Sequence, residues 1–114
     1  MGHAPAVFGA KPFKRAVFKC TQATTAAPAI GTTILNELDA ANPVLTRTSA
    51  GLYVITLAGA FTATKTFCRA KAVTPKGLGV VYTSADVITI QFTDLATPTA
   101  ADSGNFDLEI DVYF

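Results

Sequence analysis

Three acidic side chains, Asp107, Glu109 and Asp111, alternate with apolar residues near the carboxyl end of the sequence. In an extended strand, residues two apart point to the same face, so these carboxylates would project side by side. Paired carboxylates catalyse glycoside hydrolysis, and grouped carboxylate oxygens bind calcium. No histidine, tryptophan or tyrosine cluster accompanies them to shape a sugar subsite. We therefore interpret the three residues as an exposed acidic strand face rather than as a catalytic pair or a calcium site.

The other residues that could do chemistry are Cys20, Cys68 and the single histidine, His3. One histidine and two cysteines without a CxxC spacing are too few ligands for a zinc or haem site. The sequence has no GxSxG, GxGxxG or HExxH pattern, so it offers no nucleophile elbow, dinucleotide loop or zinc-protease helix. It predicts a protein that is not an enzyme, with no catalytic residues, no cofactor and no metal.

The two cysteines each lie in a run of β-like composition, which favours buried free thiols. A disulfide between Cys20 and Cys68 is the alternative if their strands are neighbours. The tyrosines Tyr53, Tyr82 and Tyr113 are interpreted as sheet residues rather than as a binding platform. The lack of tryptophan weakens the case for a carbohydrate-binding module.

The elements that would position these residues are β-strands. In the segment 106–114 apolar and polar residues alternate without a break, and 87–93 alternates in the same way. A one-residue slip would move the carboxylates of the last segment into the core, so that strand has a single acceptable register. We expect the inward residues of both segments to share one core between two sheets: Ile88, Ile90, Phe92, Leu108, Ile110 and Val112.

Further strands are predicted at 13–21, 44–48, 52–58, 65–73 and 79–83. Gly51 can supply the positive φ of a hairpin turn at 49–51. The low-complexity stretch 22–33 is predicted to be a surface loop, and 34–38 to be either a helical turn or a short strand. Together these segments predict an all-β fold, an antiparallel β-sandwich that is jelly-roll-like. A closed barrel is the less favoured alternative. We expect residues 1–12 to be an irregular N-terminal arm and residues 13–114 to form a single β-sandwich domain.

Charge is scarce and unevenly distributed. Charged residues make up 15% of the 114 residues, against about 25% in an average globular protein. All bases lie at or before Lys76, and six of the eight acids follow it. We favour a pairing of the basic first strand with an acidic later strand in one sheet. The alternative is a contact between oppositely charged faces of two subunits. Nucleic-acid binding by residues 11–19 is the least favoured interpretation. No apolar run approaches the length of a membrane span, and neither a secretion signal nor a lipid anchor is expected.

The segments 21–28, 45–67 and 83–90, with the final alternating strand, resemble small β-rich virion proteins of tailed bacteriophages, which include capsid decoration and head-fibre domains. The resemblance extends from about Lys14 onward and rests on the pattern of strands and turns. Members commonly end in a strand of the type Ile-Glu-Ile-Arg-Val-Tyr, whereas this sequence has Asp111 in place of the arginine.

The resemblance implies a non-enzymatic structural protein of a bacteriophage virion. Such a protein decorates or stabilises the capsid surface as a decoration, cement or head-fibre subunit. The resemblance also implies a homotrimer that contacts the major capsid protein or another virion protein and binds neither nucleic acid nor a membrane. Alternatives are a tail or fibre module that contacts the host and a carbohydrate-binding module.

The N-terminal arm is the predicted attachment element. Val7 and Phe8 would be its apolar anchors beside Lys11. Pro5, Gly9 and Pro12 would discourage regular structure before docking. The alternative is a frayed terminus without a binding role.

Overall fold

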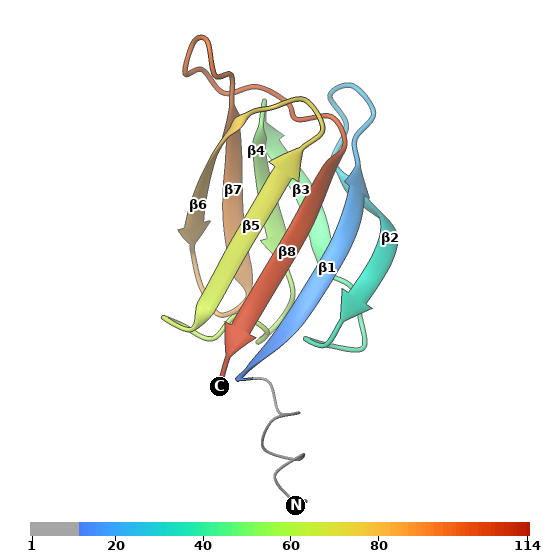
Figure 1. The fold of residues 1–114 in the computed structure, drawn as a ribbon, viewed down its shortest axis with the longest axis vertical. Coiled ribbons are helices and arrows are strands. Elements are labelled where there is room, and N and C mark those ends of the chain that lie inside the picture. Colours follow the sequence, from blue (N-terminus) through green and yellow to red (C-terminus); the bar gives the residue numbers. More distant parts are fainter. Residues whose placement is uncertain (1–11) are drawn as a thin grey trace, which may run out of the picture.

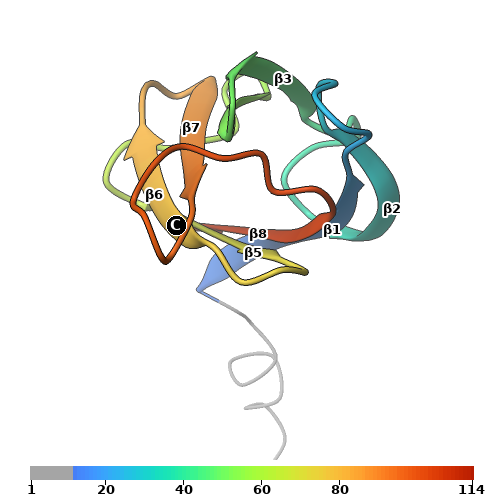
Figure 2. The same ribbon diagram turned by 90° about the horizontal axis from the view of Figure 1, so that it is seen from above.

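The computed structural model describes residues 12–114, which form strands and loops. The eight strands are β1 (Phe13–Thr21), β2 (Ala29–Asn36), β3 (Val44–Ser49), β4 (Leu52–Thr56), β5 (Thr66–Ala72), β6 (Gly77–Tyr82), β7 (Val87–Thr93) and β8 (Phe106–Tyr113). They make two antiparallel four-stranded sheets: a front sheet ordered β2-β1-β8-β5 and a back sheet ordered β3-β4-β7-β6. Figure 1 looks onto the front sheet, and Figure 2 shows the two layers from above. The predicted all-β antiparallel sandwich is confirmed.

The chain moves between the two sheets several times. The pairs β1–β2, β3–β4 and β6–β7 each stay within one sheet, while the other connections cross to the opposite layer. The last strand, β8, returns to lie between β1 and β5, a long-range connection of the kind found in Greek-key folds. As a result, both ends of the described chain meet at the lower end of the sandwich in Figure 1, where the Phe114 amide donates to the Pro12 carbonyl at 3.1 Å.

The core lies between the sheets and contains the residues that the two alternating segments predict. All six of them, Ile88, Ile90, Phe92, Leu108, Ile110 and Val112, are at most 7% exposed. The front sheet adds Phe18 and Phe106, and the back sheet adds Tyr53 and Ile55. Tyr53, Phe92 and Phe106 pack against one another in the interior, with ring centroids 5.4 to 5.9 Å apart. Period-two alternation therefore identified which side chains are buried.

Strand β2 is the largest departure from the sequence-based expectation. The stretch 22–33 was expected to be a loop, but Ala29–Asn36 is a strand paired to β1, with Lys19 opposite Thr32 and Cys20 opposite Ile30. Nearly all of its residues are exposed, because it is the edge strand of the front sheet. A strand without a buried face has no hydrophobic alternation, so the pattern from which the other strands were predicted is missing here.

Gly51 occupies the turn between β3 and β4 with a φ of +69°, as predicted. Its position is also crowded, since a Cβ there would lie 2.4 Å from the Ala101 carbonyl oxygen and 2.6 Å from that of Phe92. Glycine is thus required for two reasons, the left-handed backbone and the close approach of the 94–105 loop. Within residues 12–114 no helix is long and apolar enough to cross a membrane.

Candidate functional site

Asp111 lies between two arginines on the outer face of the front sheet. Arg15 of β1 donates from Nε to Asp111 Oδ1 at 2.8 Å and from Nη2 to Oδ2 at 3.2 Å. Arg69 of β5 donates from Nη2 to the same Oδ2 at 2.6 Å. The expectation that Asp111 faces water is wrong, because its side chain is only 3% exposed. It is buried because it is in the central strand pair, with an arginine on each side.

The ionisation of Asp111 follows from these contacts. Burial alone would raise the pKa of its carboxyl, since burial disfavours the charged form. The hydrogen bonds and positive charges of Arg15 and Arg69 outweigh that effect, so the pKa of Asp111 lies below its ordinary value. Asp111 is therefore a structural anion that holds three strands together.

The other two acids of β8 also face basic partners. Lys19 Nζ lies 2.9 Å from Asp107 Oδ1, and Arg69 Nε donates to Glu109 Oε1 at 2.7 Å. The predicted pairing of a basic first strand with an acidic later strand in one sheet is confirmed. Exposed pairs of this kind contribute about 0–1 kcal/mol each, so they set register more than stability. No three His, Cys, Asp or Glu side chains in the described part of the chain are grouped to hold a metal ion.

Cys20 and Cys68 are buried free thiols, as favoured from the sequence. Both belong to the front sheet, but β8 separates their strands, β1 and β5. Strands that are separated by one other strand lie about 10 Å apart. This distance is beyond the Cα separation of about 4.4–6.8 Å that a disulfide spans. Burial raises the pKa of each thiol to about 12. Both are core residues, and we expect their thiols to be unreactive in the folded protein.

An aromatic row crosses the front sheet at the end where the termini meet. The ring of Tyr113 lies 5.0 Å from that of Phe13 and 5.5 Å from that of Phe67, measured between centroids. The Arg15 guanidinium stands 4.8 Å over the Phe13 ring. Phe67 is half exposed, and Phe114, just past the end of β8, is 72% exposed. This row leaves an apolar surface beside Pro12, the first residue that the structure describes.

The outer face of the back sheet has a different chemistry. One row of register partners runs across all four strands through Thr46, Val54, Thr89 and Val81. The neighbouring rows are equally uncharged and contain Val44, Thr56 and Val87 on one side and Leu52, Gln91 and Gly79 on the other. The front sheet thus presents ion pairs to its surroundings, and the back sheet presents only apolar and uncharged polar groups.

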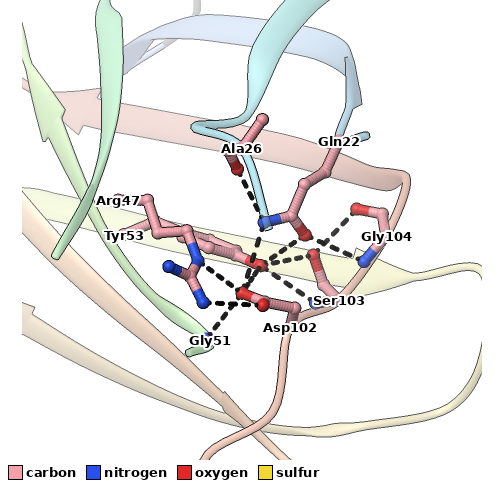
Figure 3. A network of polar contacts seen from close by, with 8 residues as sticks. All are labelled: Gln22, Ala26, Arg47, Gly51, Tyr53, Asp102, Ser103 and Gly104. Carbon is pink, nitrogen blue, oxygen red and sulfur yellow. Dashed lines mark hydrogen bonds and ion pairs between the residues drawn. The ribbon is translucent and has the colours of Figure 1, made fainter. Parts of the chain in front are cut away.

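A buried polar network lies at the upper end of the sandwich and is shown in Figure 3. The Tyr53 hydroxyl, from the back sheet, donates to Gln22 Oε1 at 2.6 Å and accepts from the Ser103 amide at 2.9 Å. Gln22 Nε2 donates to the Ala26 carbonyl at 3.0 Å, and Gln22 Oε1 accepts from the Gly104 amide at 3.1 Å. These bonds join the loop after β1 to the loop before β8.

Asp102 completes the network. Arg47 donates to both of its carboxylate oxygens at 2.9 Å, and the Gly51 amide donates to Oδ1 at the same distance. The Arg47 hydrogen bonds are the main reason why the pKa of Asp102 lies far below its usual range. No buried side-chain nitrogen or oxygen in residues 12–114 lacks a partner. A fully satisfied network of this kind fixes loops rather than offering unpaired groups to a substrate. The sequence gives no local sign of it, because its members come from four separate segments.

A pocket of about 490 Å³ lies between the loop that precedes β5 and the turn that joins β6 to β7. Its lining has no charged residue. It combines three aromatic residues, Phe61, Phe67 and Tyr82, with hydroxyl-bearing residues on both walls: Thr62, Thr64 and Thr66 on one, and Thr83 and Ser84 on the other. Interpreting Tyr82 only as a sheet residue missed this pocket, because the two walls are about 20 residues apart in the sequence.

The predicted partner-binding residues Val7, Phe8 and Lys11 lie outside the described residues, so their role stays a prediction. The described chain begins at Pro12, beside Phe114 and the aromatic row. An arm anchored there would start from an apolar surface.

No known family model, curated protein or solved structure gives a significant match to this chain.

Proposed function

We propose that this protein is a non-enzymatic structural subunit of a tailed-bacteriophage particle, bound to the capsid surface as a decoration or head-fibre subunit. The proposal starts from the resemblance in strand and turn pattern. The observation that carries it furthest is the contrast between the two outer faces of the sandwich. The outer face of the front sheet carries ion pairs, whereas the rows of residues on the outer face of the back sheet are uncharged.

An uncharged face suits permanent contact with another protein. Covering Val54 and Val81 removes apolar surface from water, and covering Thr46 and Thr89 costs little because threonine hydroxyls can find partners across an interface. Cores of interfaces are depleted in charge in the same way. The charged front sheet, with Lys19 and Asp107 exposed, suits contact with solvent.

We infer a homotrimer in which the back sheet contributes to the contacts between subunits. In a closed three-fold ring, each subunit covers the same patch on the next subunit, so no interface is left without a partner. Attachment to the particle would use the aromatic row together with the arm that starts beside it. Val7 and Phe8 then extend that apolar surface towards a capsid protein.

The attachment is tested by the occupancy of phage particles by arm variants. Deleting residues 2–12 should leave a folded β-sandwich that no longer joins particles. Val7→Ser/Phe8→Ser should reproduce the loss, whereas the matched control Ala4→Ser/Ala6→Ser should bind like the parent. Normal occupancy by the truncated protein would reject the arm as the attachment element, and the absence of the parent protein from particles would reject the proposed function itself.

The oligomer is tested by sedimentation at micromolar concentration. The parent should sediment as a trimer, and Val54→Lys, which puts a charge in the middle of the back sheet, should lower its mass towards that of the monomer. Val17→Lys is the matched control, since Val17 is also half-buried but lies on the outer face of the front sheet. A parent species of 11.9 kDa would reject self-assembly.

A further inference from the structure

We propose that the pocket between the loop before β5 and the β6–β7 turn is a binding site for a neutral saccharide unit. This inference concerns a site that shares only Phe67 with the attachment surface of the proposed structural role, and it does not depend on where on a particle the subunit lies. It stands on the pocket's chemistry, on its rigidity and on an unusual backbone conformation in its wall.

The chemistry of the lining matches a sugar ring. A pyranose presents an apolar face of C–H groups and a rim of hydroxyls, and it carries no charge. Phe67 and Tyr82, which are 50% and 48% exposed, provide aromatic surface on two different walls, and the buried Phe61 is the third aromatic residue of the lining. Because no charged residue lines the pocket, an anionic or cationic ligand would lose its hydration without gaining an ionic partner.

Two hydroxyls of the pocket, those of Tyr82 and Ser84, each keep a proton that they can donate to a ligand. The Tyr82 oxygen accepts from the Cys68 amide at 3.0 Å, which leaves its own proton to donate. Ser84 Oγ accepts from the Asp86 amide at 3.1 Å and keeps its proton in the same way. Each of these oxygens is held in place by a protein donor while its proton stays available, the combination that fixes the orientation of a hydroxylated ligand.

Both walls are tied to the rest of the fold. The Phe61 amide donates to the Ala85 carbonyl at 2.9 Å and so joins the two walls directly. Thr66 Oγ1 donates to the Thr62 carbonyl at 2.9 Å, and the Tyr113 amide donates to the Lys65 carbonyl at 2.8 Å. The pocket is therefore formed before any ligand arrives, so binding would require little ordering of the protein.

Thr64, in the wall, has a φ of +62°. A β-branched residue in the left-handed region is a genuine outlier, and such strain is concentrated at binding sites and switches. At this position the conformation belongs to the loop that carries the hydroxyls of Thr62 and Thr64. Of the two non-glycine residues with a positive φ in residues 12–114, Thr64 is thus in the pocket wall, and the other, Thr24, is in the loop after β1.

The test is a titration of the full chain with methyl glucoside, methyl galactoside and N-acetylglucosamine, followed by amide chemical shifts in NMR. At least one of these sugars should give saturable shifts confined to residues 61–67 and 82–85, with an affinity in the millimolar range typical of so small a ligand. N-acetylneuraminic acid, which is anionic, should give none. The absence of saturable shifts with all three neutral sugars, or shifts centred elsewhere, would overturn the proposal.

Variants connect the binding to the rings and hydroxyls. Phe67→Ala should weaken binding about tenfold or more, while Phe114→Ala, which removes an exposed ring outside the pocket, should bind like the parent. Ser84 lies in an exposed turn, so Ser84→Ala provides a second variant if Phe67→Ala does not fold. The Ser84→Ala protein should also bind the sugar more weakly than the parent. Unchanged affinity in both folded pocket variants would contradict the assignment. Particle occupancy does not enter these readouts, so this proposal and the structural role can fail separately.

Discussion

The Asp111 carboxylate on β8 accepts two hydrogen bonds from the Arg15 guanidinium on β1, although the two residues are 96 positions apart in the sequence. Through this pair the last strand is locked to the first, and the second arginine, Arg69, extends the lock to β5. The acidic end of the chain therefore closes the front sheet by ionic as well as apolar contacts.

The folded protein should lose stability in acid in steps that depend on Asp111 and Asp102. Both carboxyls have a folded-state pKa below the unfolded value of about 3.9, so their contribution is complete above that pH and is lost as pH falls through the folded pKa. Asp111→Asn and Asp102→Asn should each be less stable at neutral pH and show a shallower loss of melting temperature below about pH 4. The exposed variant Thr32→Ala should follow the parent at every pH. If the melting temperature of both carboxylate variants fell as steeply in acid as that of the parent, the ionic role of Asp111 and Asp102 would be contradicted.

Gly51→Ala should destabilise the protein much more than Gly59→Ala. Both glycines have a positive φ, +69° and +68°, so each alanine costs about 1 kcal/mol in backbone strain. Only at position 51 does the new Cβ also collide with backbone carbonyls, whereas nothing lies within 4 Å of it at position 59. Thermal unfolding of the two variants gives the comparison. Equal losses would show that the loop 94–105 does not press against the turn.

Ile110→Asp should cost about 4 kcal/mol or more, because it buries an unpaired charge in a core position that is 0% exposed. Thr32→Asp introduces the same residue at an exposed position opposite Lys19 and should change stability by no more than about 0.5 kcal/mol. Denaturant unfolding monitored by circular dichroism measures both. A mild effect of Ile110→Asp would mean that the register of β8 is shifted.

Cys20 and Cys68 should resist thiol reagents in the folded protein. Each thiol is buried with a pKa raised to about 12, and the thiolate is the reactive form. Both thiols should react once the protein is unfolded in denaturant, while a Thr25→Cys variant should react promptly at its exposed position without denaturant. Rapid labelling of the native parent would show that the front sheet opens locally.

Local pattern in the sequence determined the strands that have one buried face. The alternation in 87–93 and 106–114 identified β7, β8 and six core residues, because side chains on a strand change faces with every residue and only one face can be buried. The turn at Gly51 was equally predictable, since few residues other than glycine adopt its φ.

Tertiary structure alone decided the features whose partners are distant in the sequence. The segment 29–33 became a strand because β1 offered it hydrogen bonds at the edge of the sheet, and Asp111 became buried because two other strands brought arginines to it. Tyr53 acquired partners from the loops around Gln22 and Ser103, and the pocket acquired its second wall from the β6–β7 turn. Composition and periodicity describe one segment at a time, whereas these contacts exist only after chain reversal has brought separate segments together.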